Sequence, residues 1–226
     1  TTTLITGATK GLGRETARRL VELGHTVYLG ARDLERGERV AAELGATAVL
    51  LDVTDDASVE AAASRVDHLD VLVNNAGISG GFTPVGETTA ADLLRVYDTN
   101  VFGVVRVTHA FLPLLEQSTA PVVVNVSSGM GSLGVTTDPN RFESTLIGLA
   151  YSSSKTAVNM LTTQYAKAYP RMRINAVDPG YTSTDLNGHR GTQSVEEGTD
   201  AIVRMATIGP DGPTGAFVDR HGPVAW

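Results

Sequence analysis

Residues 2–13 read TTLITGATKGLG, a β-branched apolar run that passes directly into a glycine-rich turn. The run 2–6 has the composition of a buried strand. After the turn, Ala17, Leu20 and Leu23 keep the spacing of an amphipathic helix. Because a helix that begins at such a turn presents unpaired backbone N–H groups, the stretch predicts an anion site just after a strand.

The rest of the chain repeats this alternation of short β-branched runs and longer amphipathic stretches, which is typical of a parallel sheet covered by helices. It predicts the α/β class: a single domain over 1–226, built on one Rossmann-type, doubly wound parallel sheet of about seven strands in a three-layer sandwich. Two long loops, 129–150 and 180–194, follow strand carboxyl ends, where open α/β sheets bind ligands. We expect strands at 2–6, 25–29, 46–51, 69–74, 121–126, 172–177 and 216–218, and helices at 12–23, 34–44, 56–66, 90–115, 151–169 and 195–207.

The composition excludes several classes of protein. With 18 Lys and Arg against 25 Asp and Glu, the net charge is −7, and the absence of a basic cluster argues against a nucleic-acid surface. No apolar run reaches the roughly 20 residues that span a bilayer. The chain has no cysteine, which excludes disulfides and thiolate chemistry and suits a reducing, cytoplasmic location. The five histidines are scattered, so we expect no metal site.

The glycines of the first turn follow a G-x-x-x-G-x-G spacing. In such a turn one glycine permits the sharp bend, another lets the backbone approach a pyrophosphate, and a third lets the helix pack on the strand. These roles predict a dinucleotide site. The expected cofactor contacts are Gly7, Thr9, Lys10, Gly11, Leu12 and Gly13 in the turn, and Asn75, Ala76 and Gly77 after the fourth strand.

Two residues after the second strand make opposing predictions about the cofactor. Asp33 would bind a ribose 2′-hydroxyl and select NAD, whereas Arg32 would bind the 2′-phosphate of NADP. Lys10 adds a second cation near the same phosphate, so the balance favours NADP, bound as NADPH. After the third strand Asp52, followed by Val53, would accept the adenine amino group or, equally, cap the next helix.

Tyr151 and Lys155 open a predicted helix four residues apart, so the phenol and the ammonium lie on one helix face. A free tyrosine has a pKa of about 10. A cation held nearby favours the phenolate and lowers that pKa toward the working range. The pair therefore predicts a proton-transfer site, although such spacing alone occurs on many solvated helices.

These motifs together resemble the short-chain dehydrogenase/reductase family over essentially the whole chain. The likeness is carried by residues 6–13, 74–77, Asn100, Ser127 with Ser128, Tyr151 with Lys155, and Pro179 with Gly180, in family order and spacing. Within the family the chain looks most like the NADPH-dependent carbonyl reductases. That closer likeness rests on residues 30–33, 179–185, 195–198 and 215–218.

The resemblance implies a role for each matching catalytic residue. Tyr151 would be the general acid, which donates its proton to the carbonyl oxygen as hydride arrives from the nicotinamide. Lys155 would tune Tyr151 and bind the nicotinamide ribose. Ser128 would hydrogen-bond the substrate oxygen, and Asn100 would hold a water in a proton relay to Lys155. For Ser127 we expect a structural role at the end of its strand.

The resemblance also assigns the two long loops. Pro179 and Gly180 would line the nicotinamide, with Thr182 or Thr184 near its carboxamide or the pyrophosphate. The loop 180–194 would contact the substrate. The loop 129–150 is longer than the usual family spacing and reads as an insertion. Carbonyl reductases with a larger insertion here tend to be monomers, so this chain is expected to be a monomer or a homodimer.

The implied function is hydride transfer from NADPH to a ketone or aldehyde in the cytoplasm, with a small carbonyl or alcohol molecule as the partner and neither nucleic acid nor membrane. Two alternatives stay open. The first is an NAD-dependent alcohol dehydrogenase on the same scaffold, which rests on Asp33. The second is a non-catalytic NADP-sensing or interaction protein, which the presence of Tyr151 and Lys155 disfavours.

Overall fold

The computed structural model describes residues 1–81 and 83–226, and its strands form one seven-stranded sheet in the order β3-β2-β1-β4-β5-β6-β7. Each neighbouring pair of strands is parallel. The strands are β1 (Thr2–Thr6), β2 (Thr26–Ala31), β3 (Thr47–Leu50), β4 (Val71–Asn74), β5 (Val122–Val126), β6 (Arg173–Val177) and β7 (Phe217–Val218). The direction of winding reverses between β1 and β4, which makes the carboxyl ends of these two strands the expected ligand site. The Rossmann-type fold predicted from the sequence is confirmed.

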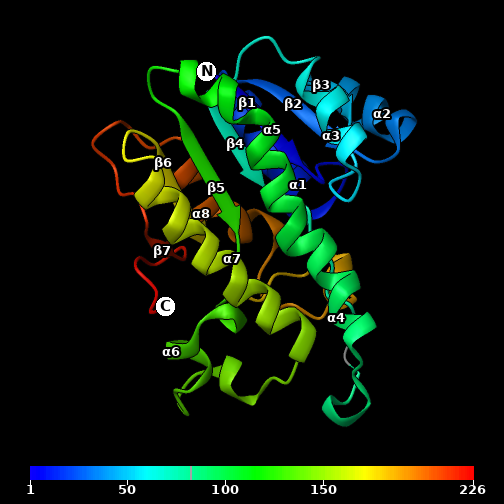
Figure 1. Cartoon of the computed structure of the whole chain (residues 1–226), viewed down its shortest axis with the longest axis vertical. Coiled ribbons are helices and arrows are strands. Elements are labelled where there is room, and N and C mark those ends of the chain that lie inside the picture. The colour runs from blue at the N-terminus through cyan, green and yellow to red at the C-terminus, as the bar shows by residue number, and fades with distance from the viewer. Residues whose placement is uncertain (82) are drawn as a thin grey trace.

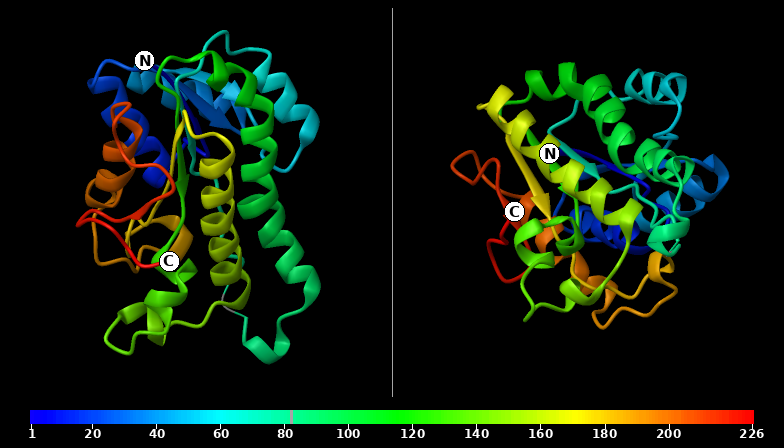
Figure 2. Two further views of the ribbon diagram at one scale, coloured as in Figure 1. Left: turned by 60° about the vertical axis from the view of Figure 1, so that its left-hand side comes forward. Right: turned by 60° about the horizontal axis from the view of Figure 1, so that its bottom comes forward.

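Helices cover both faces of this sheet, as Figure 1 and the left view of Figure 2 show. The α-helices are α1 (Gly11–Glu22), α2 (Leu34–Leu44), α3 (Asp56–Ala63), α4 (Ala90–Tyr97), α5 (Gly103–Gln117), α6 (Leu133–Thr136), α7 (Leu149–Ala168) and α8 (Val195–Ala206). The short helices are η1 (Val85–Glu87), the π-helical turn η2 (Asp98–Phe102), η3 (Gly129–Gly131), η4 (Phe142–Thr145) and η5 (Asp185–Asn187). The segment 129–150, with α6 and η4, lies beyond the carboxyl end of β5, at the bottom of Figure 1.

The core is divided in two by the sheet. One half packs α1, α2 and α8 on one face, and the other packs α3, α5 and α7 on the opposite face. In β4, Val71 and Val73 contribute to the first half while Leu72 contributes to the second. Alternate side chains of one strand therefore enter two apolar layers, and this explains why the strands read as continuous apolar runs.

The predicted strands and helices are present, with end shifts of one to three residues. The helix expected over 90–115 is divided into α4, η2 and α5. The loop expected over 129–150 contains η3, α6 and η4, and α7 begins before Tyr151, at Leu149. Both differences concern segments that carry predicted site residues.

The described part of the chain lacks two kinds of feature. None of its helices has the length and apolar character needed to cross a membrane. Nor do three or more of its Asp, Glu, His or Cys side chains gather where a metal ion could bind.

Candidate active site

A cavity of about 830 Å³ lies at the carboxyl ends of β1 and β4 and extends to the beginning of α7. Its volume is within the range of small-molecule and cofactor sites. Most of the predicted cofactor residues line it: Gly7, Thr9, Lys10, Gly11, Leu12, Gly13, Arg32, Asp52, Val53, Asn75, Ala76, Gly77, Tyr151, Lys155, Pro179 and Thr184. Residues from distant parts of the sequence thus meet at the switch point, as the parallel topology requires.

The glycine turn is shaped by contact with the end of β4. A Cβ at Gly13 would lie 2.5 Å from Asn75 Nδ2 and 2.6 Å from the Gly7 carbonyl oxygen. Asn75 Nδ2 donates to the carbonyl oxygens of Thr6 (2.9 Å) and Gly7 (3.1 Å). Position 13 therefore has no room for a side chain. The turn is a backbone cradle at a helix N-terminus, which fits a pyrophosphate.

The end of β2 supplies positive charge to the cavity. Arg32 and Arg36 both line it, and both are exposed. Asp33 caps α2, since its Oδ1 accepts from the Arg36 N–H at 3.0 Å. The cap explains Asp33 as a structural residue. The two guanidinium groups fit a phosphate on the adenosine ribose.

Lys10 contacts the loop 180–194. Its ammonium pairs with Asp185 at 2.6 Å, and Asp185 also pairs with His189 at 2.8 Å. All three side chains are more than half exposed, so these contacts contribute little to stability. They join the glycine turn to the loop that covers it. Lys10 lines the cavity as predicted while its ammonium pairs with Asp185, and Arg36 is a further cation beside Arg32.

Asp52 forms a local turn at the end of β3. Its Oδ1 accepts from the Thr54 N–H at 2.9 Å and the Thr54 hydroxyl at 2.7 Å. The cap of α3 is Asp55, whose Oδ1 accepts from the N–H groups of Ala57 and Ser58. Asp52 lines the cavity without capping the helix, so the capping alternative for this residue does not apply.

Tyr151 and Lys155 lie one turn apart near the beginning of α7. Burial raises the pKa of Tyr151 to about 12; a hydrogen bond from Ser128 lowers it, and the charge of Asp178 raises it further. Burial also lowers the pKa of Lys155 to about 8. The Lys155 ammonium donates to the Val126 carbonyl oxygen at 2.8 Å, which anchors it to the end of β5. The phenol therefore keeps its proton at neutral pH, and Lys155 is not among the groups that shift its pKa, so the lowering expected from a nearby cation is not found.

Ser128 connects β5 to η3 beside Tyr151. Its hydroxyl accepts from the Met130 N–H at 3.2 Å and hydrogen-bonds the phenol. Ser127 differs: its buried hydroxyl donates to Asn159 Oδ1, which agrees with the structural role expected for it. Of the two serines, Ser128 is the one whose hydroxyl faces the tyrosine.

Asn100 lies on the π-helical turn η2 and is 1% exposed. Its Nδ2 donates to the Ile78 carbonyl oxygen (2.9 Å) and the Ser154 hydroxyl (3.0 Å), and its Oδ1 accepts from the Ile78 N–H at 2.9 Å. A Cβ on Gly77 would lie 3.4 Å from Asn100 Oδ1 and 3.6 Å from Lys155 Nζ. Asn100 and Lys155 therefore both lie next to Gly77, which lines the cavity.

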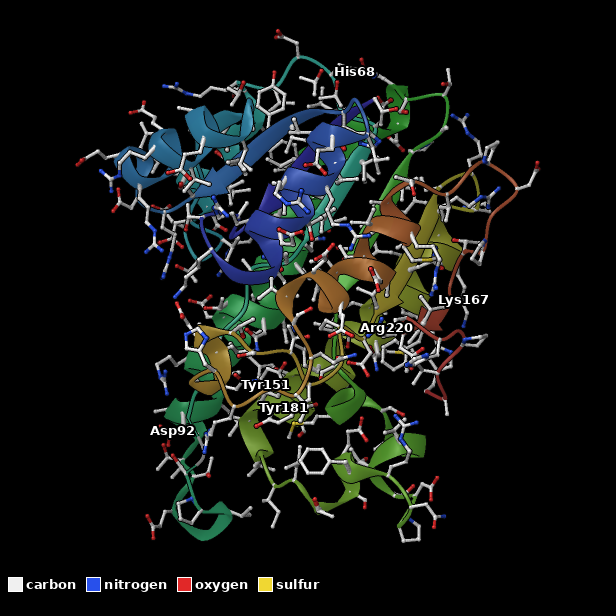
Figure 3. The ribbon with its side chains drawn as sticks, turned by 180° about the vertical axis from the view of Figure 1, so that it is seen from behind. His68, Asp92, Tyr151, Lys167, Tyr181 and Arg220 are labelled. Carbon is white, nitrogen blue, oxygen red and sulfur yellow. The ribbon has the colours of Figure 1, made fainter. Side chains whose placement is uncertain are left out.

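Four predicted residues lie outside the lining of this cavity: Asn100, Ser128, Gly180 and Thr182. Thr182 is buried and donates to the Pro179 carbonyl oxygen at 2.9 Å, while Thr184 faces the cavity. Gly180 lines a second cavity of about 400 Å³ behind Pro179. Tyr181 follows it, and its ring packs against that of Phe142 with a centroid distance of 5.7 Å; Figure 3 labels Tyr181 and Tyr151.

Sequence reasoning missed Arg36 and Asp178. The signal for Arg36 was its place three residues after the helix cap Asp33, in the first turn of a helix that begins at the cofactor end of β2. Asp178 directly precedes Pro179 but belongs to no motif recognised above.

The chain is similar to known dehydrogenases and reductases. A family model described as short chain dehydrogenase matches residues 1–194. The chain is 38% identical to the short-chain dehydrogenase anuI of Penicillium roqueforti (strain FM164), over 98% of this chain and 94% of that protein. It is 32% identical to (−)-isopiperitenone reductase of Mentha piperita, over 98% and 97%. NADPH-bound carbonyl reductase from chicken fatty liver has a similar structure, with a TM-score of 0.87 and 27% identity over 100% of this chain and 98% of that one.

The chain therefore belongs to the short-chain dehydrogenase family, whose members are oxidoreductases that bind nicotinamide cofactors. The similar proteins include an isopiperitenone reductase and, among solved structures, a carbonyl reductase.

Proposed function

We propose that this protein is a cytoplasmic, NADPH-dependent reductase that converts a ketone or aldehyde to an alcohol, with Tyr151 as general acid. The observation that carries the proposal is one cavity with a glycine turn at one end and Tyr151 and Lys155 at the other. The cofactor, when bound, supplies the hydride. The chain's own residues then have to bind the carbonyl, orient it and deliver a proton.

Tyr151 is suited to the proton step. A phenol whose pKa is raised to about 12 keeps its proton at neutral pH. It would donate that proton to the carbonyl oxygen, which Ser128 would hold through its hydroxyl. Lys155 would hold the ribose hydroxyls of the cofactor and carry charge near the phenol. Asn100 would hold a water for proton return to Lys155, beside the wall formed by Gly77.

The preference for NADPH is supported by charge at the adenosine end. Arg32 and Arg36 line the cavity, whereas the Asp33 carboxylate caps α2. A 2′-phosphate would gain charge-assisted hydrogen bonds from the guanidinium groups. Asp33 also lines the cavity and uses only its Oδ1 for the cap, so the NAD-dependent alternative rests on its Oδ2 accepting from a ribose hydroxyl.

A test uses purified protein with a panel of aliphatic ketones, aromatic aldehydes, ketoesters and quinones, followed by NADPH absorbance. We expect turnover of at least one class, with kcat/KM for NADPH above that for NADH. Higher kcat/KM with NADH would overturn the assignment of Arg32. Cofactor binding without turnover of any compound would favour the sensor alternative.

A further inference from the structure

Asp178 is a buried carboxylate between β6 and Pro179 that the proposed mechanism leaves unused. It is 5% exposed, and its own N–H donates to the Val218 carbonyl oxygen of β7 at 2.8 Å. Its Oδ1 accepts from the Gly180 N–H at 2.9 Å. A buried carboxylate of this kind requires partners, because an unpaired one is costly.

The second partner of Asp178 comes from a different loop. The Gly129 N–H lies near the same carboxylate and lowers its pKa. The fit is close, since a Cβ at Gly129 would lie 2.8 Å from Asp178 Oδ2. One side chain thus connects two backbone segments that are about fifty positions apart in the sequence but adjacent in the sheet through β5 and β6.

Both segments carry groups of the proposed reaction. Gly129 directly follows Ser128, whose hydroxyl faces the Tyr151 phenol. Gly180 directly follows Pro179, which lines the cofactor cavity. A shift of the Asp178 carboxylate would therefore move the serine and the cofactor wall relative to each other, and misplacement of about 1 Å can cost roughly a hundredfold in rate.

The charges around Asp178 are mostly negative. Burial raises the pKa of Asp178, the Gly180 and Gly129 N–H groups lower it, and the charges of Glu143 on η4 and Asp219 after β7 raise it further. Arg141 is the cation whose charge acts on it. On α7 the facing group is Tyr151. The other titratable or cationic side chains of the adjoining 400 Å³ cavity are Tyr181, Arg220 and His221.

We propose that Asp178 is a positioning residue: its carboxylate holds the Ser128 loop against the Pro179–Gly180 loop and places a negative charge beside the Tyr151 phenol. This proposal rests on the proposed function, because it assigns Tyr151 and Ser128 to the reaction. It adds a residue that acts through its neighbours rather than by touching the substrate.

Asp178→Asn tests both parts, because asparagine keeps the size and one acceptor oxygen but removes the charge and one acceptor. We expect kcat for carbonyl reduction to fall by about tenfold to a hundredfold. In the direction of alcohol oxidation, which needs the phenolate, we expect the rising limb of the pH profile of kcat to shift to lower pH, since removing a negative charge favours the phenolate.

Asp55→Asn is the matched control. Its Oδ1 also accepts from two backbone N–H groups, those of Ala57 (2.9 Å) and Ser58 (3.3 Å), but at the beginning of α3. It should keep the wild-type kcat and pH limb. If Asp178→Asn kept the wild-type kcat and the wild-type pH profile of kcat, the proposal would be overturned. Equal changes in both variants would overturn it as well.

Hydrogen exchange gives a readout that does not depend on activity. In Asp178→Asn, and in Asp178→Ser as a second variant if the first folds poorly, the Gly129 and Gly180 amides should exchange at least about tenfold faster. Unchanged exchange would show that the Asp178 carboxylate does not hold the two loops together. A wild-type protein without any reductase activity would instead overturn the proposed function, and the exchange result would still decide whether Asp178 holds the loops.

Discussion

The Lys155 ammonium lies 5.7 Å from the centre of the Tyr151 ring, one helical turn away on α7. The same nitrogen donates to the Val126 carbonyl oxygen at 2.8 Å. It is therefore anchored to the end of β5 while it faces the phenol ring. Because the two residues have different partners, their substitution should have separable effects on catalysis and on stability.

Tyr151→Phe should remove the proton donor and little else. The change deletes only the hydroxyl, so we expect kcat for carbonyl reduction to fall by about 10²–10⁴-fold, the usual contribution of general acid catalysis. The dissociation constant for NADPH, measured by fluorescence titration, should be nearly unchanged. Tyr165→Phe, on the same helix, is the control and should keep full activity. Survival of activity in Tyr151→Phe would show that another group donates the proton.

Lys155→Met should stabilise the protein at pH 7 while it removes activity. Burial lowers the pKa of Lys155 from 10.5 to about 8, so the folded state disfavours its charged form. That shift corresponds to a penalty of about 3 kcal/mol, present below pH 8 and lost as pH rises toward 10.5. Methionine avoids the penalty but leaves the Val126 carbonyl oxygen without its donor, at a cost of about 1 kcal/mol.

The net expectation is a gain of about 1–2 kcal/mol in unfolding free energy at pH 7, measured by urea denaturation. The gain should disappear as the pH rises to 10.5, where the wild-type lysine is neutral in the folded state and half protonated in the unfolded state. A variant that is less stable than wild type at pH 7 would contradict the buried-charge argument.

Much of the fold follows from local sequence patterns. The apolar run 2–6, the glycine spacing and the helical period after it depend on neighbouring residues alone, and all three are present. Tyr151 and Lys155 could be paired from their spacing because a helix places positions i and i+4 on one face. These are features that a short window of sequence contains.

Other parts depend on contacts between distant segments. The π-helical turn that holds Asn100 lies where Arg106 donates to the carbonyl oxygens of Val53 and Asp98 and pairs with the Asp98 carboxylate. Helical periodicity cannot show that a carbonyl will be used by a tertiary contact. The short helices of 129–150 have too few residues to show a period. Asp178 could not be identified because its two N–H partners come from different loops.

Loss of Arg32 and Arg36 should weaken the preference for NADPH. If both guanidinium groups bind the 2′-phosphate, the double alanine variant should raise KM for NADPH roughly ten- to hundredfold, from lost charged hydrogen bonds of about 1.5–3 kcal/mol. KM for NADH should change little. Arg39→Ala, which removes an exposed arginine paired with Glu35 on the same helix, is the control. An equal rise in KM for both cofactors would mean that the two arginines do not bind the 2′-phosphate.

Gly131→Ala should disturb the catalytic helix. A Cβ at Gly131 would lie 2.6 Å from the carbonyl carbon of Lys155, a backbone atom that cannot rotate away. Either η3 or α7 has to shift, which should lower the unfolding free energy by about 1–3 kcal/mol. Since the displaced atom belongs to Lys155, kcat should fall as well. Gly209→Ala, where a Cβ would meet open space, is the control and should change neither quantity. If Gly131→Ala kept both wild-type stability and kcat, the packing of η3 on α7 would not determine the position of Lys155.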